Sequence, residues 1–125
     1  MEWTDSQSWE LLVLPGPRHQ ITGKYLFFSE SAAELRSIAE RECSEHGFFL
    51  AKISKVPASS EHVMCLYWFN DNRKHELANR HKNHSAVKYR YWKSDAATLS
   101  GEYSRQFLES CLDEDGEEID EDRPY

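Results

Sequence analysis

The spacing of apolar and polar positions along the chain predicts alternating strands and helices. Lys24–Ser29 is rich in aromatic residues and predicts a strand. Apolar residues at helical spacing predict a helix over about Ala32–His46, which Ser31 and Glu34 would open as a capping box. His62–Asn70 is apolar on both faces, which favours an interior strand.

Shorter patterns predict the remaining elements. Apolar residues before Pro15 favour a short helix over roughly Ser6–Leu14. The others are a strand over Phe48–Val56, a largely exposed helix from Asn70 or Asp71 to about Asn83, a strand over Val87–Lys93 and a closing helix over about Tyr103–Leu112. This order predicts an α+β domain with a largely antiparallel sheet and helices on one face.

Length and charge divide the chain into a single domain, residues 1–112, and an acidic tail, residues 113–125. Eight of the 22 acidic residues lie within 113–122, and residues 1–112 carry 14 acidic and 14 basic residues. The tail cannot bury enough apolar area to offset its ordering entropy, so we expect it to be disordered. It would either solubilise the protein or fold back over a basic surface as a mimic of a polyanion.

Several classes of protein are disfavoured by composition. The three cysteines are widely spaced and form no CxxC pair, which argues against a disulfide framework and a zinc ribbon. His81 and His84 have metal-ligand spacing, but neighbouring cations would repel a metal ion. No apolar run is long enough to span a bilayer, and the N-terminus lacks the pattern of a signal peptide. We therefore expect a cytoplasmic protein with no metal, cofactor or membrane partner.

The strand that begins at Val87 carries the most informative pattern for function. Alternation would place Lys88, Arg90 and Trp92 on one side of it. Two cations and an indole suit a planar anionic ligand, although a solvated face with extended lysines is the plainer interpretation. Seven cations fall within 21 residues here, namely Arg73, Lys74, Arg80, Lys82, Lys88, Arg90 and Lys93.

Two further lysines occupy strands whose alternation otherwise places apolar residues at their positions. Lys24 precedes Leu26 and Phe28, and Lys52 follows Phe48 and Leu50, at strand spacing. Such a lysine either extends to solvent or marks a cleft. In a cleft, burial would lower its pKa and make it a candidate general base.

Four segments of the chain together resemble a known family. They are TGKYLFF (Thr22–Phe28), AKIS (Ala51–Ser54), HVMCLYWFNDNRK (His62–Lys74) and Tyr91–Tyr103. In this order they are similar to motifs of the basophilic leukaemia-expressed protein family, whose members are also described as phosphothreonine lyase domain-containing. The resemblance covers about Trp9–Tyr103. It implies a fold like that of the cap-binding translation initiation factor 4E, a curved antiparallel sheet backed by helices.

The resemblance also implies which positions matter. By motif match these are Lys24, Lys52, Lys93, Asp95, Thr98, Gly101 and Tyr103. The chain departs from the family pattern at Tyr25, where a tryptophan is usual, and at Ser94. Cap recognition needs two tryptophans and an acidic partner, which cannot be assigned here, so it is not carried over.

The leading hypothesis is a small module that binds a nucleotide or an RNA phosphate. Lys88, Arg90 and Lys93 would contact phosphate, and Trp92 would stack on a base. Lys24 and Lys52 would flank the cleft, with Asp95, Thr98 and Tyr103 added by motif match. The alternatives are a lyase or phosphoesterase-type enzyme with a lysine base and a histidine acid, and an adaptor that binds a protein partner.

Overall fold

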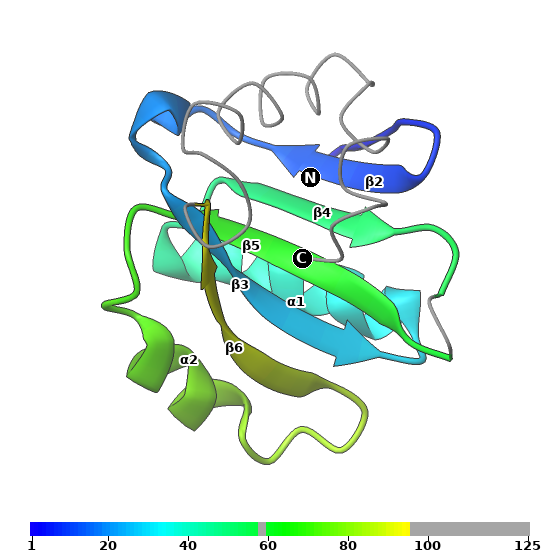
Figure 1. Cartoon of the computed structure of the whole chain (residues 1–125). Coiled ribbons are helices and arrows are strands. Elements are labelled where there is room, and N and C mark those ends of the chain that lie inside the picture. The colour runs from blue at the N-terminus through cyan, green and yellow to red at the C-terminus, as the bar shows by residue number, and fades with distance from the viewer. Residues whose placement is uncertain (58–59, 96–125) are drawn as a thin grey trace.

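The computed structural model describes residues 1–57 and 60–95. Within these ranges, six strands form one sheet and two α-helices pack against it (Figure 1). The strands are β1 (Trp3–Asp5), β2 (Trp9–Val13), β3 (Gly23–Ser29), β4 (Leu50–Ser54), β5 (His62–Trp68) and β6 (Lys88–Ser94). The helices are α1 (Ala32–His46) and α2 (Lys74–His81), and a 3₁₀ turn covers Arg18–Gln20.

The sheet has the order β1-β2-β4-β5-β3-β6, and each of these neighbouring pairs is antiparallel. The predicted interior strand, β5, lies between β4 and β3, while β6 forms an edge of the sheet within the described residues. The sheet curves, and α1 lies across one of its faces (Figure 1). The prediction of an antiparallel α+β domain is therefore confirmed.

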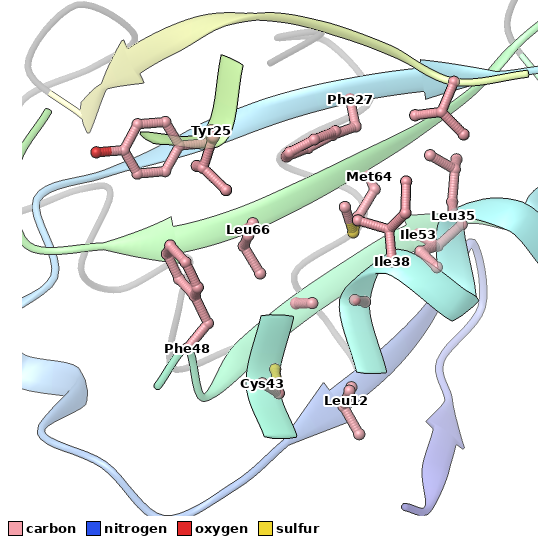
Figure 2. Packing of buried hydrophobic residues seen from close by; sticks show 14 residues of the cluster. Leu12, Tyr25, Phe27, Leu35, Ile38, Cys43, Phe48, Ile53, Met64 and Leu66 are labelled. Carbon is pink, nitrogen blue, oxygen red and sulfur yellow. The ribbon is translucent and has the colours of Figure 1, made fainter. Parts of the chain in front are cut away.

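Helix α1 has the predicted bounds because its start and end signals are local. The Ser31 hydroxyl accepts a hydrogen bond from the Glu34 amide at 3.2 Å, and Gly47 ends the helix with φ 83°. Its apolar stripe, which includes Leu35, Ile38 and Cys43, is buried against the sheet (Figure 2). Helix and sheet thus share one apolar core.

The sheet is apolar on both faces. Cross-strand partners point to the same side of a sheet, so the register separates two sets of side chains. Tyr25, Phe27 and Leu66 belong to the core shared with α1, which Figure 2 shows. Leu26 and Tyr67 belong to a second buried cluster on the opposite face. We call these the helix side and the far side of the sheet.

The predicted helix over Ser6–Leu14 is wrong. The segment contributes most of a hairpin, in which β1 and β2 are joined by a turn where the Ser6 amide donates to the Trp9 carbonyl at 2.9 Å. Trp9 and Leu11 join the far-side cluster, whereas Leu12 joins the core on the helix side. Pairing with β4 buries both faces of this short apolar run, and this distant partner outweighs the helix that apolar residues before Pro15 favoured.

The second helix is shorter than predicted and less exposed. It is limited to Lys74–His81, and both Leu77 and His81 are buried. His81, expected at the surface, lies 2.7 Å from the Glu42 carboxylate of α1. The predicted closing helix and the acidic tail lie outside the described residues. In the part that the structure describes, no helix is both long and apolar enough to cross a bilayer.

Candidate anion-binding face

The far side of the sheet gathers the predicted cations. Lys93 pairs directly with Lys24 across β6 and β3, and Lys88 pairs with Phe28 at the other end of the same two strands. Lys52 of β4 pairs with Cys65, which lies two residues before the Tyr67 partner of Lys24. The cationic face consists of Lys24, Lys52, Lys88, Arg90 and Lys93.

A one-residue irregularity in β6 decides what this face contains. Leu26 pairs with Tyr91 and Phe27 pairs with Tyr89, so Arg90 is an extra residue between them. The Arg90 guanidinium carbon lies 5.5 Å from the centre of the Phe28 ring, on the far side. The bulge therefore leaves Arg90 on the same side as Lys88, as predicted, but reverses the alternation after it.

Trp92 is consequently not part of the cationic face. Its indole lies 4.7 Å from the Tyr25 ring, between centroids, and packs against the core on the helix side. The prediction that Trp92 shares a side with Lys88 and Arg90 is wrong, because simple alternation cannot anticipate a bulge. The indole lies instead on the side of the sheet that carries α2.

Lys24 and Lys52 are buried rather than extended to solvent. Their exposed fractions are 3% and 0%. The Lys52 ammonium lies 4.0 Å from the centre of the Trp9 ring, and the Lys24 ammonium lies 5.9 Å from that of Tyr67. Aromatic faces at these distances attract a cation. Of the two interpretations open for these lysines, extension to solvent is therefore wrong.

The outer end of the face is open to solvent and includes one acidic residue. The side chains of Lys88 and Arg90 are 64% and 47% exposed. Their nitrogens lie 3.7 and 4.0 Å from the Glu61 carboxylate. At these separations and exposures the ion pairs are weak, so both cations remain available to a ligand.

Arg73, which precedes α2, and Arg80 within α2 belong to a different surface. Arg73 and Arg80 both pair with Glu76, and Arg80 also pairs with Glu42, so their charges are matched within the protein. These contacts lie on the helix side. The stretch of seven cations in the sequence is thus divided by the sheet, and only its last three members reach the cationic face.

The remaining predicted site residues lie at or beyond the end of β6. Asp95 is 6% exposed, and its amide donates to the Thr22 carbonyl at 2.7 Å. Thr98, Gly101 and Tyr103 lie outside the described residues. Four of the positions chosen by motif match are described by the structure. Lys24, Lys52 and Lys93 lie on one face, and Asp95 lies just beyond it.

Three neighbours of these cations escaped the sequence analysis. Trp9 and Tyr67 provide the rings beside Lys52 and Lys24, and Glu61 faces Lys88 and Arg90. The hairpin of β4 and β5 could have indicated Tyr67, since antiparallel pairing places it near the lysine strands. Trp9 was missed because its segment was predicted to be helical.

The histidines of α2 do not lie on the cationic face. His81 packs edge-on against the Phe27 ring, at 5.3 Å between centroids, on the helix side. The cationic face carries lysines suited to bind an anion, but a lyase would also need an acid beside them. His81 therefore does not pair with these lysines as the acid of such an enzyme.

The chain matches no protein-family model, no curated protein and no solved structure.

Proposed function

We propose that this protein binds single-stranded RNA or a related polyphosphate ligand along the cationic face. The observation that carries the proposal is the gathering of five cations on one side of the sheet, three of them on β6. Lys24 and Phe28 are four residues apart, which corresponds to about 13 Å along a strand. The cations thus extend beyond the reach of a single phosphate.

The five cations would have two roles. Lys88 and Arg90 are exposed and Lys93 is half-buried, so these three would contact phosphate oxygens directly. Lys24 and Lys52 are buried and would add positive potential from beneath. Lys24 and Lys93 are direct cross-strand partners, so their ammonium-bearing side chains lie on the same part of the face.

The resemblance to the basophilic leukaemia-expressed protein family supports the cationic face as the binding site. The motif match selects three of its five cations, Lys24, Lys52 and Lys93. A curved antiparallel sheet with helices on one side also supports the proposal that the fold is like that of initiation factor 4E. The proposal concerns phosphate binding only and includes no cap recognition.

The test is fluorescence anisotropy of a labelled single-stranded oligouridylate, titrated with the protein over a range of salt concentrations. Three phosphate contacts predict a slope of about −2 for the logarithm of the binding constant against the logarithm of salt concentration. The variant with Lys88→Gln, Arg90→Gln and Lys93→Gln should bind weakly and with a nearly flat slope.

Arg41→Gln is the matched control, because Arg41 is an exposed cation on α1, across the sheet from the cationic face. It should leave both affinity and slope close to those of the unaltered protein. Absence of RNA binding at low salt, or an equal loss in the Arg41 variant and the triple variant, would refute the proposal.

A further inference from the structure

A groove opens between α2 and β6 on the helix side of the sheet. Its volume is about 440 Å³, within the range of small-molecule sites. Lys74, His75 and Ala78 line it from α2, and Asp71 from the preceding turn. The β6 wall is formed by Tyr89, Arg90 and Trp92.

The aromatic wall is held in place from behind. Trp92 packs on Tyr25, and the Tyr25 hydroxyl donates to the Asn70 carbonyl at 2.8 Å. The same hydroxyl accepts a hydrogen bond from the Arg73 amide at 2.9 Å. Tyr25 thus ties the turn that precedes α2 to the strand beside Trp92, and the two walls of the groove are fixed relative to each other.

Charged groups of both signs lie at the mouth of the groove. The Lys74 ammonium lies 3.5 Å from the Asp71 carboxylate, and both side chains are about half exposed. Burial raises the pKa of Tyr89 to about 12, so its phenol stays neutral at physiological pH. The Arg90 guanidinium is directed to Phe28 on the far side, which leaves Lys74 and His75 as the basic groups of the groove.

We infer that this groove binds a purine nucleoside monophosphate. The base would stack against Trp92 and Tyr89, and its phosphate would meet Lys74 and His75, replacing the Asp71 carboxylate beside Lys74. An acidic peptide would match the basic groups but would leave the aromatic wall without a planar partner. The site opens on the opposite side of the sheet from the cationic face, shares only Arg90 with it and does not depend on the function proposed for that face.

Calorimetric titration with adenosine monophosphate (AMP) tests the inference, with uridine monophosphate for comparison. AMP should bind more tightly, because its larger base stacks over more of the aromatic wall. Trp92→Leu should weaken AMP binding about tenfold or more. Lys74→Ser, at a half-exposed position, should weaken it several-fold, and it keeps the test decisive if the Trp92 variant fails to fold.

Two controls separate this groove from the cationic face. Lys82→Ser alters an exposed cation next to α2 that does not line the groove, and it should leave AMP affinity unchanged. The double variant with Lys88→Gln and Lys93→Gln, which keeps Arg90 of the groove wall, should also retain AMP binding while losing most of its RNA affinity. Failure of the unaltered protein to bind AMP, or equal AMP affinity in the Trp92→Leu, Lys74→Ser and unaltered proteins, would overturn the inference.

Discussion

At the scale of single residues, Gly23 determines where the indole of Trp92 can lie. A Cβ atom at Gly23 would approach the Trp92 ring to 2.5 Å and the Lys93 carbonyl oxygen to 2.7 Å. Side chains do not pack at such distances, so only glycine allows the ring to cover the first residue of β3. The position of one wall of the α2–β6 groove therefore depends on the absence of a side chain on the neighbouring strand.

We predict that Gly23→Ala destabilises the protein by about 1–3 kcal/mol, because the methyl group must displace the indole or the β6 backbone. Urea denaturation would measure this. Part of the cost should disappear in a Trp92→Leu background, since the two substitutions act on one contact. An equal cost in both backgrounds would show that the indole is not the obstacle.

Gly47→Ala provides the contrast. Gly47 has a positive φ, and a Cβ atom at this position would meet no atom within 4 Å. The cost of the substitution is therefore conformational and amounts to about 1 kcal/mol. That cost should be the same with Trp92 or Leu at position 92.

At the scale of elements, a buried ion network joins the two helices. Glu42 of α1 is fully buried and accepts hydrogen bonds from Arg80 at 2.8 and 2.7 Å, with His81 at 2.7 Å. Arg80 also donates a hydrogen bond to Glu76. The hydrogen bonds from Arg73 and Arg80 lower the pKa of Glu76 to about 2. The network fixes α2, and therefore the helix wall of the groove, against α1.

We predict that Glu42→Gln destabilises the protein by about 3 kcal/mol at neutral pH, because it leaves Arg80 without its buried counter-charge. Burial raises the pKa of Glu42, but the hydrogen bonds from His81 and Arg80 together lower it below its usual 4.5. The folded state therefore favours the carboxylate. This stabilisation is present above about pH 4.5 and is lost as the pH falls through the lowered pKa.

Urea denaturation at several pH values would check this prediction. The gap in stability between the unaltered protein and Glu42→Gln should stay constant from neutral pH to about 4.5 and narrow as the pH falls further. Glu45→Gln, at an exposed position of the same helix, should change stability by no more than about 0.5 kcal/mol. A gap that stays constant with pH would contradict the lowered pKa of Glu42.

Elements differ in how far the sequence determines them. Helix α1 was predictable to the residue because the Ser31 cap, the apolar spacing and Gly47 are all local signals. The β1–β2 hairpin was not, because Trp9–Val13 gains its stability from pairing with β4, a distant segment. The burial of His81 likewise depends on Glu42, 39 residues away.

The site shows the same division. Lys24, Lys52 and Lys93 could be selected from local patterns and from motif resemblance, but their presence on one face follows only from the strand register. The separation of Trp92 from Arg90 depends on a bulge that forms against β3. No pattern within β6 alone could have revealed it.

At the scale of the whole molecule, the formal net charge of −7 conceals a balanced body with a cationic face. The excess negative charge is carried by residues 113–125. Their eight carboxylates repel a polyanion, and they also compete for any basic surface within reach. Binding of RNA should therefore depend on the acidic segment as well as on the cations.

We predict that replacing these eight acids by their amides, in the full-length chain, tightens RNA binding several-fold at low salt. The difference should fade at high salt, where the screening length falls to about 3 Å. Anisotropy with the same oligouridylate would measure both effects. Unchanged affinity at low salt would mean that the segment has no electrostatic influence on the cationic face.

The bulge in β6 has a further consequence for self-association. A regular edge strand offers evenly spaced amides and carbonyls, on which a strand from another molecule can assemble. The extra residue at Arg90 interrupts that spacing, and Lys88 and Arg90 would meet like charges on a second copy. Among the described strands β6 lies at the edge, and the irregularity that orients its cations thus also disfavours the addition of a strand from another molecule there.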